Sequence, residues 1–473
     1  MTNLRAFLLA TVAAIGALAI SAGAASAAPC SLPGVADGTL NGETTTASGV
    51  FTESQKGSYV QIPFNVPVAT TGMRIRYCYD TNNSTTLDMG VYEPAPGGGA
   101  PGMAQSRGWS GSAVKQIGIA KDGFTPVGIY DVDSSSRKAY NSGYTTRAYE
   151  PGAIPAGEWT AELGLGWIPP ASTDPDGITW QVEVTTTTDS SWSDVPYAPD
   201  PYVPNVANPA AGWYDGDFHV HGEEEPGNAP MEQTFEKGFG AGPAGNDLDF
   251  MTLVDHNNVV ARGEIGRYDQ IRPGKLIMQG TEVTTYNGHW NSQNAGQLAD
   301  FRAGPVLRFD DGDADDQVEA GELPQVRASL DPSTQFAASS ASGGWAQINH
   351  PTIFNNAPSA CRGCAWAYSD AQTDFSKVDA IEVSTGPAVL PNNQVIPAVT
   401  ANPYLASAIA YYEHALSTGA HIAAVASSDD HQGGDRDQPA NATDSQVGRG
   451  ATAVYANELS QAGITAAVKA DHT

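Results

Sequence analysis

The stretch SDVPYAPDPYVPNVANPAAG, residues 193–212, divides the chain into two parts and thereby decides its fold. Its prolines are Pro196, Pro199, Pro201, Pro204 and Pro209. Proline at this density favours an extended tether without ladder hydrogen bonds. Because the composition of the chain differs on the two sides, we predict one folded domain over residues 28–192 and a second over residues 213–473.

The residues before the tether read as strands. Runs rich in β-branched and aromatic residues are separated by turn residues and include YVQIPFNV (59–66), WTAELGLGWI (159–168) and ITWQVEVTTTT (178–188). Such runs, with no helical periodicity between them, are typical of an all-β sandwich.

After the tether the pattern alternates. Apolar runs such as LDFMTLVDH (248–256), WAQINH (345–350) and HIAAVASSDDH (421–431) are interleaved with helical stretches, the best of which is NPYLASAIAYYEHALSTG (402–419). In that helix Asn402 is placed to cap, and Leu405, Ile409, Tyr412 and Leu416 share one face. Alternation of this kind indicates βα units and an α/β domain.

The first 27 residues read as a cleaved signal peptide. Arg5 supplies the positive end, residues 7–20 the apolar core, and Ala25-Ser26-Ala27 the cleavage site. No other segment has the roughly 20 apolar residues that a membrane helix needs. We therefore expect a secreted protein with no membrane association.

The excess of acidic residues limits the kinds of partner that the protein can bind. The formal net charge is −29, from 52 acidic and 23 basic residues. Nucleic-acid polymers are bound by neutralising phosphates with Lys and Arg, so this composition disfavours them as partners. No protein partner is indicated, and we expect a small-molecule substrate.

Four cysteines in an exported chain point to disulfides. Pairing Cys30 with Cys78 would fix the N-terminus to a strand, and pairing Cys361 with Cys364 would close the loop SACRGCAW. The sequence permits three connectivities, and a lone CxxC pair is also found in redox-active and zinc sites.

Histidines gather in the second domain. All nine lie at or after position 219, and six of them fall at or just beyond the ends of predicted strands: His219, His221, His256, His289, His350 and His431. The carboxylates Asp255, Glu282 and Asp429 accompany them. In GDFHVH the strand period of two places both imidazoles on one face, so both can reach one ion. His414, His421 and His472 do not fit this pattern, and we assign none of them to the site.

Six motifs in this half of the chain resemble those of a known family. They are HVH (219–221), VDHNN (254–258), GTEVTTYNGHWN (280–291), NHP (349–351), IEV (381–383) and SSDDH (427–431). Their order resembles that of the PHP (polymerase and histidinol phosphatase) superfamily, and the GTEVTT…GH segment resembles its CehA/McbA-like branch. The resemblance covers residues 213–470 and implies a distorted (β/α)7 barrel of the PHP type after the all-β sandwich.

The resemblance also implies a metal site with two or three divalent cations (Mn, Zn or Fe). It places His219, His221, Glu282 and Asp429 on a first ion, and His289 and His350 on a second that shares Glu282. It places His256 and His431 on a third. The ninth ligand of the family is missing from GEEEPGNAP, so Glu223, Glu224 or Glu225 would have to supply it, unless they are only solvated.

Three further carboxylates are candidates for orienting the ligands. Asp217 and Asp255 each neighbour a ligand, and Glu382 lies inside its strand. Carboxylates that accept a hydrogen bond from a metal-bound imidazole fix its orientation.

The expected activity follows from these ions. A hydroxide formed on two cations at neutral pH would attack a phosphoester, such as a phosphomonoester or nucleotide. The same hydroxide would serve a carbamate or carboxylic ester hydrolase. A non-catalytic metal-binding module is a third interpretation.

The insertion FDDGDADDQVEAGEL (309–323) carries a separate pattern of oxygen ligands. Counting from Asp311 gives a calcium-loop register of Asp311, Asp313, Asp315, Gln317, Glu319 and Glu322. Asp316 stands where such loops need glycine, and an acidic, solvated insertion is the alternative.

Overall fold

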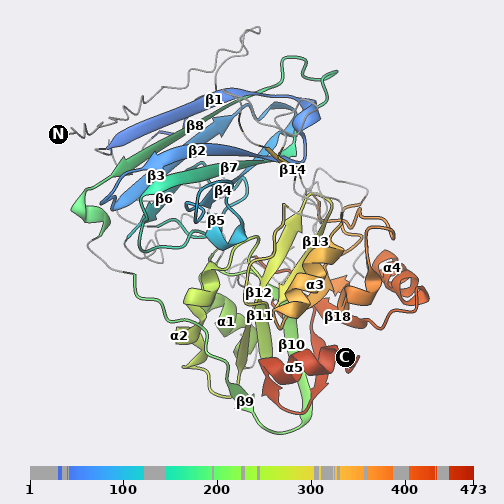
Figure 1. Cartoon of the computed structure of the whole chain (residues 1–473). Helices are drawn as coiled ribbons and strands as arrows, with labels where there is room; N and C mark the ends of the chain where they lie inside the picture. The colour runs from blue at the N-terminus through green and yellow to red at the C-terminus, as the bar shows by residue number, and fades with distance from the viewer. Residues whose placement is uncertain are drawn as a thin grey trace, which may run out of the picture.

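The computed structural model describes residues 30–34, 40, 42–121, 145–193, 197–224, 229–241, 245–302, 308–309, 323, 325–327, 331–355, 361, 363–386, 404–431, 433 and 447–473. Several predicted features fall outside these residues, including the signal peptide, Glu225 and the calcium loop 311–322. Figure 1 shows two stacked domains, the first lying on one end of the second.

The first domain consists of two antiparallel sheets. One has the order β1 (Glu43–Phe51), β8 (Ile178–Thr187), β3 (Gly72–Tyr79), β6 (Gln116–Ala120). The other has the order β14 (Arg308–Phe309), β15 (Gln325–Arg327), β2 (Ser58–Val66), β7 (Gly157–Trp167), β4 (Thr86–Tyr92), β5 (Ser106–Trp109). The 3-10 turns η1 (Glu53–Gln55), η2 (Asn82–Ser84), η3 (Met103–Gln105) and η4 (Ser190–Trp192) connect them.

Strand β7 is buried on both faces. Its odd positions, among them Trp159, Leu163 and Leu165, belong to the core between the two sheets. Its even positions, Glu162, Gly164 and Gly166, lie on the opposite face because side chains alternate along a strand. That second face is covered by the second domain, through Arg302 and Tyr286.

Two strands of this sheet come from the second domain. Gln325, Val326 and Arg327 of β15 pair with Val60, Tyr59 and Ser58 of β2. The segment that carries them lies between β13 and β16 in the chain, so the sandwich is completed by residues far beyond the tether. No local pattern predicted this pairing.

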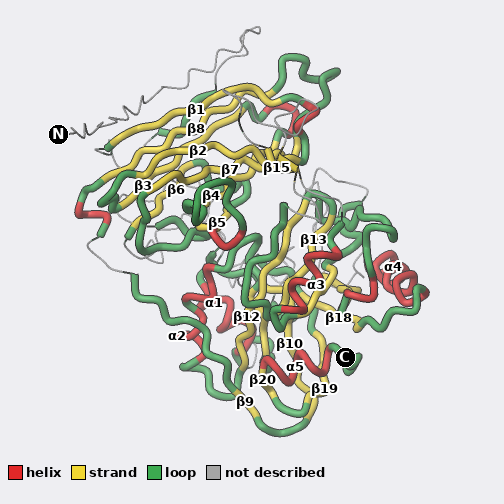
Figure 2. The backbone as a smooth tube through the Cα atoms, viewed as in Figure 1, coloured by secondary structure: helices red, strands yellow, loops and turns green. Residues whose placement is uncertain are grey.

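The second domain is built on an eight-stranded sheet. Its order is β18 (Ala423–Ser427), β17 (Ala380–Thr385), β16 (Trp345–Ile348), β13 (Gly288–Gln293), β12 (Leu276–Thr285), β11 (Phe250–Leu253), β10 (Gly212–Val220), β19 (Thr452–Ala456). The helices are α1 (Met231–Phe239), α2 (Ile265–Asp269), α3 (Ser333–Ala341), α4 (Leu405–Ser417) and α5 (Gln461–Val468), with 3-10 turns η6 (Val260–Gly263) and η7 (Phe375–Lys377). Figure 2 shows the α-helices of the second domain, in red, on the outside of its sheet.

The sheet curls until its two ends nearly meet. Beyond the end of β18, Asp430 forms a bridge with Val220 of β10, and the backbone N–H of Asp429 donates to the carbonyl of His219 at 2.9 Å. This closure brings the loop after β18 against the end of β10, and both carry predicted site residues.

The expected (β/α)7 barrel is wrong. In the described residues β12 turns directly into β13 through Tyr286 and Asn287, and β13 runs antiparallel to both its neighbours. The connection from β16 to β17 contains only the three-residue η7 among its described residues. The fold is a mostly β structure with a nearly closed mixed sheet, because a hairpin takes the place of a helical crossover.

The tether and the best predicted helix also differ from expectation. Residues of the tether form β9 (Val206–Asn208), which pairs with β20 (Leu459–Ser460) although ladder bonds were not expected there. Helix α4 buries Ala408 and Ala415, whereas Ile409 and Leu416 are 40% and 38% exposed. The small residues let this helix pack closely, Tyr411 and Tyr412 also pack against the core, and Ile409 and Leu416 point outward. Asn402 lies outside the described residues.

Both expected disulfides are present. Cys30 is bonded to Cys78 of β3, and Cys361 is bonded to Cys364. Among the described residues, none of the helices has the length and apolar character that a membrane crossing requires.

We predict that the two disulfides differ in their contribution to stability. A crosslink restricts the unfolded chain more when it closes a longer loop, and the sequence separations are 48 and 3 residues. Cys30→Ser/Cys78→Ser should therefore lower the free energy of unfolding by about 2–4 kcal/mol, and Cys361→Ser/Cys364→Ser by less than about 2 kcal/mol. Chemical denaturation of the two variants measures this, and equal losses would contradict the prediction.

Candidate metal centre

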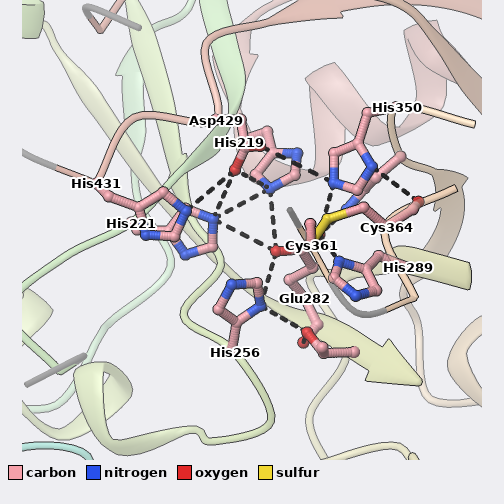
Figure 3. The surroundings of a disulfide bond; sticks show 12 residues. His219, His221, His256, Glu282, His289, His350, Cys361, Cys364, Asp429 and His431 are labelled. Carbon is pink, nitrogen blue, oxygen red and sulfur yellow. Dashed lines mark hydrogen bonds and ion pairs between the residues drawn. A yellow bond between two sulfur atoms is a disulfide. The ribbon is translucent and has the colours of Figure 1, made fainter. Parts of the chain in front are cut away.

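The eight predicted ligands meet at one end of the curled sheet. His219 and His221 lie at the end of β10, and His256, His350, Asp429 and His431 follow β11, β16 and β18. The parallel strands all end at this edge of the sheet. Glu282 lies near the end of β12, and His289 lies near the start of β13, which reaches the same edge because it runs antiparallel. Figure 3 shows these side chains pointing toward one another.

Four donor atoms surround one point. The Nε2 atoms of His219 and His221 are 3.1 Å apart, and each lies 3.2 or 3.1 Å from Oδ1 of Asp429. Oε2 of Glu282 lies 3.3 Å from the first imidazole and 3.4 Å from the second. A tetrahedral ion with bonds of about 2.0–2.1 Å holds its ligand atoms about 3.3–3.4 Å apart. The spacing therefore fits one divalent cation.

The second oxygen of Glu282 faces a different pair of imidazoles. Oε1 lies 3.2 Å from Nδ1 of His289 and 3.1 Å from Nε2 of His350. One carboxylate thus faces two groups of donors with its two oxygens. This is the arrangement of a bridging ligand between two ions.

His256 and His431 lie on the outer side of the first group. Nδ1 of His256 is 2.8 Å from Oε2 of Glu282, and Nε2 of His431 is 3.4 Å from Oδ1 of Asp429. The ring of His431 stacks on that of His221 with centroids 3.9 Å apart. Ligand atoms of His221, His256 and His431 lie within 4.8 Å of one another, close enough for one more ion.

The charges of the centre favour cation binding. Burial acts to raise the pKa of Glu282, but His256 and His219 outweigh it and hold that pKa well below its ordinary value. Burial likewise acts to raise the pKa of Asp429, and His219 with the hydrogen bond to His221 holds it well below. Both carboxylates are therefore anionic, as a metal ligand must be.

One buried nitrogen lacks a partner. The His289 side chain is 4% exposed, and its Nε2 makes no hydrogen bond within the described residues. Burial lowers the pKa of His289, so the ring is neutral. A buried imidazole nitrogen left unpaired is unfavourable unless something else binds it, so this nitrogen fits an ion or ligand on the side of the ring away from Glu282.

Of the three carboxylates expected to orient imidazoles, Asp217 and Asp255 accept backbone N–H groups beside the candidate ligands, and Glu382 contacts an imidazole. Oδ1 of Asp217 accepts the backbone N–H of His219 and of Ser428, and burial raises its pKa to about 7. Asp255 accepts the N–H of Gly222 at 2.6 Å.

Glu382 connects two ligands. Its Oε1 lies 3.3 Å from Nδ1 of His219, and its Oε2 accepts the backbone N–H of His350 at 2.7 Å and the hydroxyl of Thr385 at 2.8 Å. With Nδ1–H of His219 directed at this carboxylate, the Nε2 of that ring is free to face an ion.

Two ligands have unusual backbone conformations. His350 has φ +28° and Asp429 has φ +56°, values that residues with a side chain rarely adopt. Such positions cost about 1–3 kcal/mol each and persist where the surroundings fix them. No local pattern of residues predicted this strain.

Glu223 and Glu224 lie in a separate ion cluster. Nη1 of Arg147, from the first domain, lies 2.6 Å from Glu224 and 2.7 Å from Glu264, and its Nη2 lies 3.4 Å from Glu223. Burial raises the pKa of Glu224 to about 8. The candidates for the missing ligand that the structure describes therefore contact an arginine of the first domain.

The first domain also holds the hairpin that carries Glu282 and His289. Tyr286, at its tip, donates a hydrogen bond to Oδ2 of Asp88 at 2.8 Å and stacks on Tyr59 with ring centroids 5.4 Å apart. A Cβ added to Gly164 would lie 2.3 Å from the Tyr286 hydroxyl. The alternating glycines of LGLGW thus leave room for this ring, a signal that sequence reasoning missed.

Trp109 of β5 reaches the metal ligands directly. Its partly buried indole lies edge-on to His256, with ring centroids 6.4 Å apart. The first domain therefore forms one wall of the candidate site. The three unassigned histidines lie elsewhere: His414 and His421 have side chains 49% and 92% exposed, and His472 is exposed.

Comparisons with known proteins give little further guidance. No protein-family model and no curated protein matches the chain. Among solved structures, PliG of Aeromonas hydrophila, a periplasmic inhibitor of g-type lysozyme, is 15% identical with a TM-score of 0.17, covering 31% of this chain and 89% of its own. PliG of Salmonella Typhimurium is 11% identical with a TM-score of 0.14, covering 32% of this chain and 94% of its own.

The expected membership of the PHP superfamily is overturned. No family model supports it, and the described residues form a mostly β structure without the (β/α)7 barrel that the superfamily implies. The short HxH, NHP and SSDDH motifs mark strand ends rich in histidine. Motifs this short occur wherever histidines follow strands, so they do not establish a family.

We predict that Glu282→Gln removes cations from the purified protein. The substitution keeps the volume of the side chain but loses the negative charge that faces both groups of imidazoles. Metal content per chain should fall to one or less, while the circular dichroism spectrum is unchanged. Glu158→Gln, an exposed glutamate of β7, is the matched control and should keep its metal. Full metal content in Glu282→Gln would refute the bridging arrangement.

We also predict that filling the space beside Gly164, which the Tyr286 ring occupies, weakens metal binding. Gly164→Ala would push the tyrosine out of its position and should cost about 1–3 kcal/mol of stability. It should also lower the affinity for Zn²⁺ in a competitive titration, because the hairpin carries two ligands. Gly212→Ala, where a Cβ meets nothing within 4 Å, is the control. Unchanged affinity in Gly164→Ala would show that the hairpin tip does not position the ligands.

Proposed function

We propose that this protein is a metal-dependent hydrolase with two cations in the centre described above. The observation that carries the proposal is the spacing of the two imidazoles of His219 and His221, whose Nε2 atoms lie 3.1 Å apart and each 3.1–3.4 Å from an oxygen of Asp429 and of Glu282. In the proposal His289, His350 and the other Glu282 oxygen hold the second cation. His256 and His431 would hold a third.

Cations in this position would supply a water of lowered pKa and would polarise the scissile bond of an ester. The protein supplies the rest. Asp429 and Glu282 are deprotonated ligands, and Glu382 keeps the proton of His219 on Nδ1. The donor set of imidazoles and carboxylates suits Mn, Zn or Fe.

A phosphoester is the substrate class that the charge favours. Six of the eight candidate ligands are imidazoles, which are neutral when they bind a metal, and only two are carboxylates. Two dications against two carboxylates leave a local charge of about +2, in contrast to the acidic composition of the whole chain. An anionic small molecule such as a phosphomonoester or nucleotide would be attracted to this site.

A carboxylic ester or carbamate is the second candidate. The observation in its favour is Trp109, whose indole lies beside His256 and gives the site one apolar wall. An uncharged ester could bind by packing an apolar group against this indole, and its binding would not require attraction to the positive charge of the centre.

We further propose that the protein acts outside the cytoplasm. The support comes from its two disulfides, which persist in oxidising compartments, and from the signal-like sequence of residues 1–27.

The test is a panel of substrates with added Mn²⁺ or Zn²⁺. We expect p-nitrophenyl phosphate or bis-p-nitrophenyl phosphate to be hydrolysed faster than naphthyl acetate, and His219→Ala to lower turnover by at least about 100-fold. His421→Ala removes an exposed histidine that is not part of the centre, and it should keep full activity.

The outcomes separate the candidates. Preferential hydrolysis of naphthyl acetate would favour the carboxylic ester hydrolase. Stoichiometric metal binding with no turnover of any substrate in the panel would point to a metal-binding module and contradict the proposed activity.

A further inference from the structure

The disulfide between Cys361 and Cys364 lies beside the second group of donors (Figure 3). Ligand atoms of His289, His350 and Cys364 lie within 4.8 Å of one another, and all three residues are buried. In the disulfide the Cys364 sulfur has no negative charge and is a poor ligand. A thiolate at the same place would be a strong one.

Cys364 is held in place by contacts that do not involve the disulfide. Its backbone carbonyl lies 3.1 Å from Nδ1 of His350, which donates to it. Two residues later the N–H of Trp366 donates to the carbonyl of Pro351 at 2.9 Å, and the N–H of Ala367 donates to that of Asn287 at 2.7 Å. Breaking the disulfide therefore leaves Cys364 next to the centre.

An independent observation points to an unfilled position here. Nε2 of His289 is buried without a hydrogen-bond partner within the described residues, and the side chain is 4% exposed. Its Nδ1 already faces Glu282 at 3.2 Å. The Nε2 atom is therefore available to a further ligand group or ion on the side away from Glu282.

We propose that reduction of the Cys361–Cys364 disulfide creates a thiolate-containing metal site of Cys364, His289 and His350. A dithiol donates two electrons and two protons, the S–S bond breaks into two thiols, and the dithiol becomes a disulfide. Binding of a soft divalent cation then releases the Cys364 proton. The redox state of this pair sets whether sulfur joins the centre.

The distances allow this with a small movement. A tetrahedral zinc ion with Zn–S of about 2.3 Å and Zn–N of about 2.1 Å holds sulfur and nitrogen about 3.6 Å apart. The present atoms are within 4.8 Å, and cleavage frees the Cys364 side chain to rotate. Sulfur ligation shifts preference from Mn²⁺ toward Zn²⁺ because thiolates are soft ligands. The inference extends the proposed centre and is tested without turnover.

The experiment uses Co²⁺ as a spectroscopic probe of the full-length protein. A cobalt–thiolate bond gives a charge-transfer absorption in the near ultraviolet, whereas nitrogen and oxygen ligands give only weak visible bands. We expect no charge-transfer absorption in the oxidised protein and a clear one after reduction with a phosphine that does not bind the metal. The absence of the band after verified reduction would overturn the proposal.

Two single variants identify the sulfur. Cys361→Ser leaves Cys364 as a free thiol and should show the band without any reductant, whereas Cys364→Ser should not show it at all. A band of equal strength in Cys364→Ser would assign the ligand to Cys361 and overturn the proposal. The visible bands of the oxidised protein report separately on the proposed metal centre, so a failure of either idea is recognised on its own.

Discussion

Burial of the Glu282 carboxylate is the constraint on which the centre depends. The side chain is fully buried, and its two oxygens lie close to the nitrogens of five imidazoles. Leaving a buried carboxylate without a partner costs about 3–5 kcal/mol of stability. The surrounding imidazoles, and the cations proposed to bind here, therefore stabilise the buried charge of Glu282. Glu382 contacts the ring of His219, and Asp217 holds the backbone at the same residue.

The position of the centre also depends on contacts between the two domains. Glu282 and His289 lie on a hairpin, and a hairpin tip in water would be free to move. Here the tip packs on the outer face of the sheet that contains β2 and β7, with Tyr286 against Tyr59 and Gly164. Arg302 adds a second attachment through its ion pair with Glu162 at 2.8 Å, on the same face of β7. The sandwich is therefore part of the structure that shapes the site.

Sequence reasoning found the residues of the centre better than it found the fold. The period of two in GDFHVH and the histidines at strand ends follow from local rules, and the structure brings those residues together. The hairpin was missed because GTEVTTYNGHWN was interpreted as a family motif, although an Asn-Gly pair between two strand-like runs is a common hairpin signal; the structure places Tyr286 and Asn287 in the turn. The pairing of β15 with β2 joins residues 267 positions apart, as in Ser58 and Gln325, and no local pattern reports on it. Helix α4 shows the same limit, since it buries Ala408 and Ala415 while Ile409 and Leu416 of the predicted apolar face are exposed.

The pairing of β15 with β2 also affects how the chain is made. Strand β2 is not an outer strand in the finished protein, because residues 325–327 cover it. During synthesis from the N-terminus, however, everything up to the tether is complete while that cover is still missing. For this interval β2 presents unpaired N–H and carbonyl groups, which other chains can pair with. The sandwich is thus completed only after the second part of the chain has been synthesised. Cutting the chain at the tether would leave the first part with an unpaired edge strand.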